Sequence, residues 1–202
     1  MSRLLLVRHG NTKLNNATRF WGKTDVELSD EGVRQAEQLR DRLATQKINA
    51  IYASNLSRAR LTAEMIASRH RLNVKTCTEM GEINFGFIEG LTFEEIKKLH
   101  PELAEELSNW SVSPQFPGGE SLDDLNSRVQ TFLKRLEKHK PEETILIVAH
   151  SATLRLLICN LLEIDLHHWR QMRLDLASLS ILETYSQGTI LNLLNDVSHL
   201  KP

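Results

Sequence analysis

The chain has 202 residues, of which 41% are hydrophobic and 25% charged, a length that suits one well-packed core. Its 25 Lys and Arg against 26 Asp and Glu give a formal net charge of -1, which argues against nucleic acid or an anionic membrane as a partner. The apolar stretches are too short for a membrane span, and the two cysteines fit no disulfide framework. We therefore expect a cytoplasmic protein that has no membrane partner, and any affinity for anions must be local.

Strand-like and helix-like patterns alternate along the chain. Short apolar runs predict buried strands, and apolar residues three or four apart predict helices. Thr92 with Glu95 matches a capping box. The segment 117–121 predicts a turn followed by a helix N-cap. In an alternative interpretation, this segment presents Glu120 or Ser121 to a pocket. In chain order, the predicted elements are a strand at 4–7, a helix from Asp30, a strand at 48–53, a helix from Ser57, a strand at 73–77, a helix at 93–100, another from Pro101, a helix from Ser121, a strand at 144–149, a helix at 154–162 and a hairpin of strands at 177–184 and 189–194.

This alternation of strands with crossover-length helices predicts an α/β fold. Parallel strands need helical crossovers, and those helices cover both faces of the sheet. We expect a three-layer α/β/α sandwich with a mostly parallel central sheet. The chain contains no repeat, low-complexity tract or flexible linker, so residues 1–202 are expected to form a single domain.

Arginine and histidine residues follow the predicted strands where those strands end. Arg8 and His9 come directly after the first strand, and His150 follows the strand at 144–149. Arg58 opens the helix after the second strand. Because ligands of such sheets bind beyond the carboxyl ends of the strands, we expect the two histidines to face one pocket. A buried guanidinium costs several kcal/mol unless it is paired, so Arg8 needs an anion or a path to solvent.

Each of these signals has an ordinary explanation when it is taken alone. Arg8, His9 and Gly10 are compatible with a surface turn, and Arg58 with a solvated helix start. Together, two guanidiniums and two imidazoles form a site for a dianion that needs no metal, because guanidinium forks match phosphoryl oxygens. Arg60, two residues further on, is interpreted as structural or solvated.

Five ordered blocks carry a resemblance to a known family. The opening LVRHGNT, with Asn15 six residues after His9, resembles the signature of the histidine phosphatase superfamily, the phosphoglycerate mutase-like proteins. The segments at 20–29, 54–63, 82–90 and 148–151 resemble further family motifs, and the closing stretch at 193–200 is similar to that of α-ribazole phosphatases. The resemblance implies a phosphoglycerate mutase-like fold with a small helical cap insertion at roughly 85–119. Asn11 departs from the pattern, since many members carry Glu or Gln there.

The resemblance also implies roles for individual residues. His9 would be phosphorylated, Arg8, Arg58 and His150 would clamp the phosphoryl oxygens, and Glu82 would be the proton donor. We expect the ring of His9 to be neutral, with one nitrogen donating to a backbone carbonyl such as that of Gly10 and the other attacking phosphorus. The apolar loop with Phe85 and Phe87 is expected to favour a protonated Glu82. The residues expected to bind substrate are Asn15, Thr12, Trp21, Gly22 and Ser151.

The function expected from this pattern is hydrolysis of a phosphomonoester through a phosphohistidine intermediate, with no metal and no cofactor. The leading substrate is α-ribazole 5'-phosphate, which would place the enzyme in cobalamin biosynthesis, and sugar phosphates or phosphoglycerate come next. A phosphoglycerate mutase uses the same pocket, but family mutases tend to be longer. An inactive phosphate-binding or docking module is an alternative of another class. A metallohydrolase is disfavoured because the eight histidines lack HExxH spacing. The chain is expected to be a monomer or a homodimer paired through its late strands.

Overall fold

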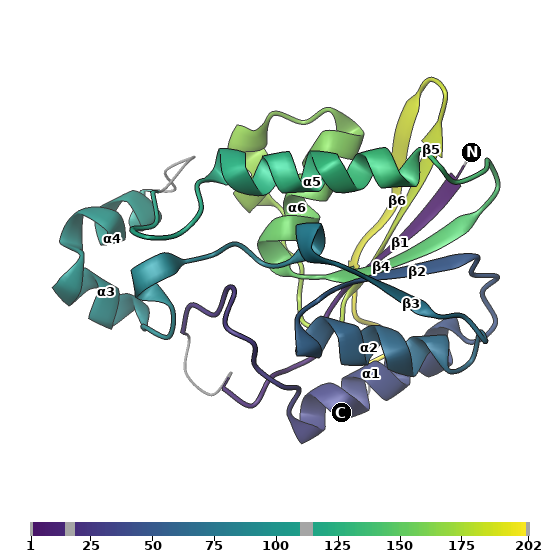
Figure 1. The fold of residues 1–202 in the computed structure, drawn as a ribbon, viewed down its shortest axis with the longest axis horizontal. Helices are drawn as coiled ribbons and strands as arrows, with labels where there is room; N and C mark the ends of the chain where they lie inside the picture. Colours follow the sequence, from purple (N-terminus) through teal and green to yellow (C-terminus); the bar gives the residue numbers. More distant parts are fainter. Residues whose placement is uncertain (1, 15–18, 110–114, 201–202) are drawn as a thin grey trace.

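The computed structural model describes residues 2–14, 19–109 and 115–200. Within these ranges six strands form one mixed sheet in the order β3-β2-β4-β1-β5-β6 (Figure 1). The first four strands along the chain run parallel, whereas β5 is antiparallel to both of its neighbours. The prediction of a mostly parallel sheet is therefore confirmed. The strands are β1 (Ser2–Arg8), β2 (Ala50–Ser54), β3 (Val74–Cys77), β4 (Thr144–Ala149), β5 (Leu179–Tyr185) and β6 (Gly188–Asp196).

Helices cover both faces of the sheet, which confirms the three-layer arrangement (Figure 1). Side chains alternate between the two faces along a strand. Leu5 of β1 therefore packs in one apolar cluster with residues of α1 (Asp30–Leu43) and α2 (Ser57–Ala67). Leu4 lies in the other cluster, with residues of α5 (Leu122–Leu136) and α6 (Ser151–Leu162).

Polar side chains fix the starts of three helices. Ser29 accepts a hydrogen bond from the Gly32 amide in front of α1. Thr92 and Ser121 each complete a capping box, the first with Glu95 and the second with Asp124. Since a cap of this kind satisfies amides that have no partner within the helix, it sets the first residue of the helix. The helix starts predicted at Asp30, Phe93 and after Ser121 are confirmed.

Between β3 and α5, the residues that the structure describes form four short helical segments. They are η1 (Thr78–Met80), η2 (Gly86–Ile88), α3 (Phe93–Leu99) and α4 (Pro101–Ser108). In Figure 1, α3 and α4 lie beyond the end of the sheet. Their buried side chains Ile96, Leu103 and Leu107 belong to the same apolar cluster as α5 and α6. The segment predicted as a cap thus shares one core with that side of the sheet.

Some elements differ from the predictions, and η1 and η2 were not predicted. α6 begins at Ser151 instead of Leu154, because His150 has extended backbone and serves as its N-cap position. The turn η3 (Leu166–Gln171) was not predicted; the Asp165 carboxylate accepts from the His167 amide at its start. In the described ranges, no helix combines the length and the apolar character that crossing a membrane requires.

Candidate active site

Two histidines meet at the carboxyl edge of the sheet. β1 and β4 are neighbours, and Arg8 pairs with Ala149 at their ends. The next residues, His9 and His150, are consequently brought together, with ring centroids 5.0 Å apart. Both rings are buried. The structure thus brings the two distant histidines together, as expected.

The His9 ring has one nitrogen fixed by the protein. Its Nδ1 lies 2.8 Å from the Gly10 carbonyl oxygen. Because a carbonyl only accepts, Nδ1 carries the hydrogen and Nε2 keeps a lone pair. A Cβ at position 10 would lie 2.6 Å from the Gly32 oxygen, so glycine lets this loop pack against the start of α1. The expected orientation of the His9 ring is present.

The His150 ring is oriented by a serine at the end of the adjacent strand. Its Nε2 lies 2.8 Å from the Ser54 hydroxyl, which can donate to it, and the hydroxyl oxygen accepts from the Leu56 amide at 3.2 Å. Nδ1 of His150 is buried and has no hydrogen-bond partner among the described residues. Since a buried polar atom without a partner is costly, this nitrogen is suited to a bound ligand.

Arg58 and Arg8 place two guanidiniums beside the imidazoles. Arg58 is 2% exposed and donates to the carbonyls of Thr24 at 2.9 Å and Gly22 at 2.7 Å. Arg8 donates to the Leu174 carbonyl at 2.6 Å, and its buried Nε has no partner in the described part of the chain. Carbonyl acceptors orient a guanidinium without neutralising it, so the positive charge remains available to an anion.

This surrounding charge acts on the protonation of the two histidines. Burial lowers the pKa of His9 and of His150 well below the ordinary value, and the positive charge of Arg58 lowers both further. Burial is the largest cause and Arg58 the next. Both rings are therefore neutral near pH 7, the form that a nucleophile requires.

Glu82 reaches the same edge from the loop after η1. Its carboxylate accepts from the amides of Ala152 at 3.2 Å and Thr153 at 3.3 Å, in the first turn of α6. These two amides hold the Glu82 side chain at the start of α6. The expected enclosure by phenylalanines is wrong: Phe87 is 74% exposed, and Phe85 packs edge-on against Phe20 and Phe116.

The residues predicted to bind substrate take different positions. Thr12 is buried and forms a bridge with Leu28. The Gly22 carbonyl binds Arg58, and the indole of Trp21 packs beside Gly90. Ser151 is the first residue of α6 and is partly exposed. Asn15 lies outside the described residues.

Two further predicted positions have local partners. The amide oxygen of Asn11 accepts from the Ser29 hydroxyl at 3.0 Å, so this side chain supports the start of α1. Arg60 is exposed and pairs with Glu64 at 3.3 Å, as expected for a solvated residue. In the described ranges, no group of three His, Cys, Asp or Glu side chains could hold a metal ion.

The sequence analysis missed two polar residues near the site. Ser54 ends β2 at the carboxyl edge, and this placement, shared with His9 and His150, could have identified it. Arg155 of α6 lies with its guanidinium 6.0 Å from the Trp169 ring centroid, and its buried Nε has no partner in the described segments. Burial and then the charge of Arg8 lower the pKa of Arg155, which adds a cation to the site's surroundings.

The fold and this edge define an α/β protein with two buried histidines beside two arginines at the carboxyl ends of its strands. The sequence profile of the histidine phosphatase superfamily (branch 1) matches residues 4–197. The chain belongs to this superfamily, and the family resemblance found in its motifs is confirmed.

Individual relatives agree with this membership. Phosphoserine phosphatase 1 of Hydrogenobacter thermophilus is 33% identical over 203 residues, covering 99% of this chain and 95% of that protein. Phosphoglycerate mutase-like protein 4 of Arabidopsis thaliana is 39% identical over 156 residues, covering 75% of this chain and 67% of its own. The crystal structure of the α-ribazole phosphatase from Shigella flexneri superposes with a TM-score of 0.88 at 28% identity, over 96% of each chain.

Proposed function

We propose that the chain is a phosphomonoester hydrolase that forms a phosphohistidine on His9. The observation that carries this proposal is the buried pair of His9 and His150, 5.0 Å apart, with the His9 hydrogen committed to the Gly10 carbonyl. Arg8 and Arg58 add positive charge beside His9, where the phosphoryl group would be transferred. A phosphoryl transition state is stabilised mainly by such positioned positive charge.

In the first step, the Nε2 lone pair of His9 attacks phosphorus and the bond from phosphorus to the leaving oxygen breaks. That oxygen takes a proton from Glu82, whose protonated form is favoured when the negatively charged substrate binds beside it. In the second step, Glu82 removes a proton from water, which attacks the phosphohistidine and releases inorganic phosphate and neutral His9. The Nδ1 hydrogen of His150 and the guanidiniums of Arg8 and Arg58 bind the phosphoryl oxygens through both steps.

We further propose a small phosphorylated metabolite as substrate, with no metal or other cofactor. α-Ribazole 5'-phosphate is the leading candidate, supported by the superposition with an α-ribazole phosphatase. Phosphoserine is the second, because a relative covering nearly the whole chain is a phosphoserine phosphatase. In this proposal residues 1–202 act as one cytoplasmic domain, and the segment 85–119, with α3 and α4, caps the pocket and selects the leaving group. Thr12, Trp21, Gly22, Ser151 and Asn15 remain proposed substrate contacts.

A panel of phosphomonoesters tests the proposal. The panel contains α-ribazole 5'-phosphate, O-phosphoserine, 3-phosphoglycerate, glucose 6-phosphate and 4-nitrophenyl phosphate, assayed for free phosphate with and without a strong chelator. We expect release of free phosphate that the chelator does not change and that His9→Ala abolishes. Conversion of 3-phosphoglycerate into 2-phosphoglycerate without free phosphate would show a mutase instead. Absence of turnover on every substrate would favour an inactive phosphate-binding module.

A further inference from the structure

The segment 79–84, which carries Glu82, is open to a cavity on one side. This cavity measures about 260 Å³ and is lined by Glu79, Gly81 and Glu82 of the segment and by Glu120 and Arg128. Met80 anchors the other side of the segment in the apolar core. On the cavity side, the polar side chains of Glu120 and Arg128 are the ones placed to fix this backbone through hydrogen bonds.

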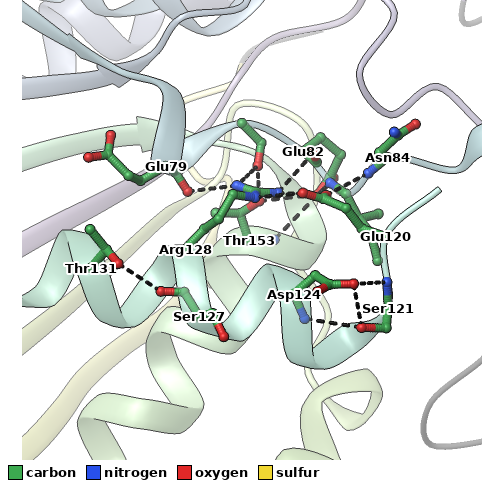
Figure 2. A network of polar contacts seen from close by, with 12 residues as sticks. Glu79, Glu82, Asn84, Glu120, Ser121, Asp124, Ser127, Arg128, Thr131 and Thr153 are labelled. Carbon is green, nitrogen blue, oxygen red and sulfur yellow. Dashed lines mark hydrogen bonds and ion pairs between the residues drawn. The ribbon is translucent and has the colours of Figure 1, made fainter.

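Arg128 of α5 supplies these bonds (Figure 2). Its Nη1 donates to the carbonyls of Glu79 at 2.7 Å and Gly81 at 3.2 Å, and Nη2 donates to the Glu82 carbonyl at 3.4 Å. Nε and Nη2 also donate to the two Glu120 oxygens, each at 2.8 Å. A guanidinium has five N–H donors in a fixed plane, and these contacts use all five.

Glu120 forms hydrogen bonds with the backbone of the next part of the loop, at Asn84. Its Oε2 accepts from the Asn84 amide at 2.9 Å, and its own amide donates to the Asn84 carbonyl at 2.9 Å. Burial acts to raise the pKa of Glu120, but the hydrogen bonds from Arg128 and Asn84 outweigh it and leave that pKa lowered. Glu120 is thus ionised at neutral pH and pairs with Arg128 in a partly shielded position.

The opposite side of the segment is held by α6. The Thr153 hydroxyl donates to the Gly81 carbonyl at 2.7 Å, and the amides of Ala152 and Thr153 bind the Glu82 carboxylate. Arg128 therefore fixes the backbone of Glu82, while α6, the helix that begins directly after His150, holds its carboxylate. Figure 2 shows Arg128, Glu82 and Thr153 within one network of polar contacts.

We propose that Arg128 and Glu120 form a positioning pair that sets the place of Glu82 beside the phosphoryl pocket. Neither residue touches the reacting atoms; both act through the 79–84 backbone. This inference rests on the proposed role of Glu82 as proton donor. Displacement of a catalytic group by about 1 Å can cost roughly 100-fold in rate. Loss of the pair should therefore weaken proton donation by Glu82 while substrate binding is retained.

The test compares leaving groups in an Arg128→Lys variant. A single ammonium cannot bond three carbonyls and a carboxylate at once. For the alkyl phosphate with the highest kcat/KM in the panel, we expect kcat to fall by about tenfold or more while KM stays within about twofold. With 4-nitrophenyl phosphate, whose leaving group needs no proton, we expect a fall below about threefold. Glu120→Gln keeps one acceptor for Arg128. Its kcat should also fall more on the alkyl phosphate than on 4-nitrophenyl phosphate, but by a smaller factor than in Arg128→Lys.

Two controls separate positioning from a general loss of structure. Arg135→Lys changes another arginine of α5, whose ion pair goes to the Glu79 side chain and not to the loop carbonyls. It should leave the ratio of the two kcat values unchanged. A double variant of Arg128→Lys with Glu82→Gln should be no slower on the alkyl phosphate than Glu82→Gln alone, because Arg128 has no proton donor left to position.

The outcomes also distinguish the two levels of the proposal. If Glu82→Gln is selective for the alkyl phosphate but Arg128→Lys and Glu120→Gln slow both substrates equally, the positioning pair is wrong and the proposed function stands. If the kcat losses of Arg128→Lys and Glu82→Gln multiply in the double variant, the positioning pair is also wrong. If Glu82→Gln slows both substrates equally, Glu82 is not the proton donor, and the positioning proposal falls with that assignment.

Discussion

Each edge of the sheet holds a histidine network, and the two differ in how the ring nitrogens are used. Near the amino edge, His139 bonds both nitrogens to protein side chains, Tyr52 at 2.8 Å and Glu143 at 2.6 Å. At the carboxyl edge, His9 and His150 each use one nitrogen, for Gly10 and for Ser54. Their remaining nitrogens have no protein partner within the described residues.

The charges beside these histidines also differ between the two edges. His139 lies against a carboxylate, whereas His9 and His150 lie among the guanidiniums of Arg8 and Arg58. Because both nitrogens of His139 are bonded to protein side chains, neither is left to attack or bind a phosphoryl group. A buried histidine with one free nitrogen beside cations is suited to attack, or donate to, an anionic group.

After the loss of activity expected for His9→Ala, the largest expected effect comes from the guanidinium of Arg58. In an Arg58→Lys variant, one ammonium cannot hold the carbonyls of Gly22 and Thr24 and also bind phosphoryl oxygens. We expect kcat/KM for 4-nitrophenyl phosphate to fall by about 100-fold, or about 2.7 kcal/mol of transition-state stabilisation. Arg60→Lys, on the same helix but pairing with Glu64, is the matched control and should stay within about twofold. Equal losses of kcat/KM in both variants would contradict the proposed role of Arg58 in binding the phosphoryl oxygens.

A smaller effect concerns the pH dependence of stability. The pKa values of His9 and His150 are lowered in the folded protein, mainly by burial. Between those lowered values and the ordinary value, the unfolded chain binds more protons, so the free energy of unfolding falls as pH decreases below about 6.5. Each histidine contributes a slope of up to about 1.4 kcal/mol per pH unit. Urea unfolding from pH 7.5 to 5 should give a shallower fall for His150→Gln than for the wild type. Identical slopes would contradict the buried neutral state.

Much of the fold could be predicted because its signals are local. The apolar run at 144–149 identifies a central strand whatever its neighbours are, and the capping boxes at Thr92 and Ser121 mark helix starts by adjacent residues. The start of α6 could not be predicted in this way. His150 belongs to no preferred N-cap type, and its conformation is imposed by the packing of β4 against its neighbours.

The site was predictable where strand ends carry the chemistry, as for His9, His150 and Arg8. Arg58 adds a helix start to the same edge. The supports were not predictable: Arg128 lies on a helix whose pattern reveals only its apolar face, and its loop acceptors are more than forty positions away. Glu82 illustrates the same limit, since the sequence suggested an apolar setting and the structure provides the amides of α6.

The central claim is that His9 carries the phosphoryl group during turnover. The most direct measurement is rapid quench of the wild-type enzyme with a labelled phosphomonoester, followed by mass spectrometry of peptides kept at alkaline pH. We expect an acid-labile phosphate on His9 that forms before free phosphate is released. Phosphate on another residue, such as His139, or continuous turnover with no labelled protein at any time, would contradict the account.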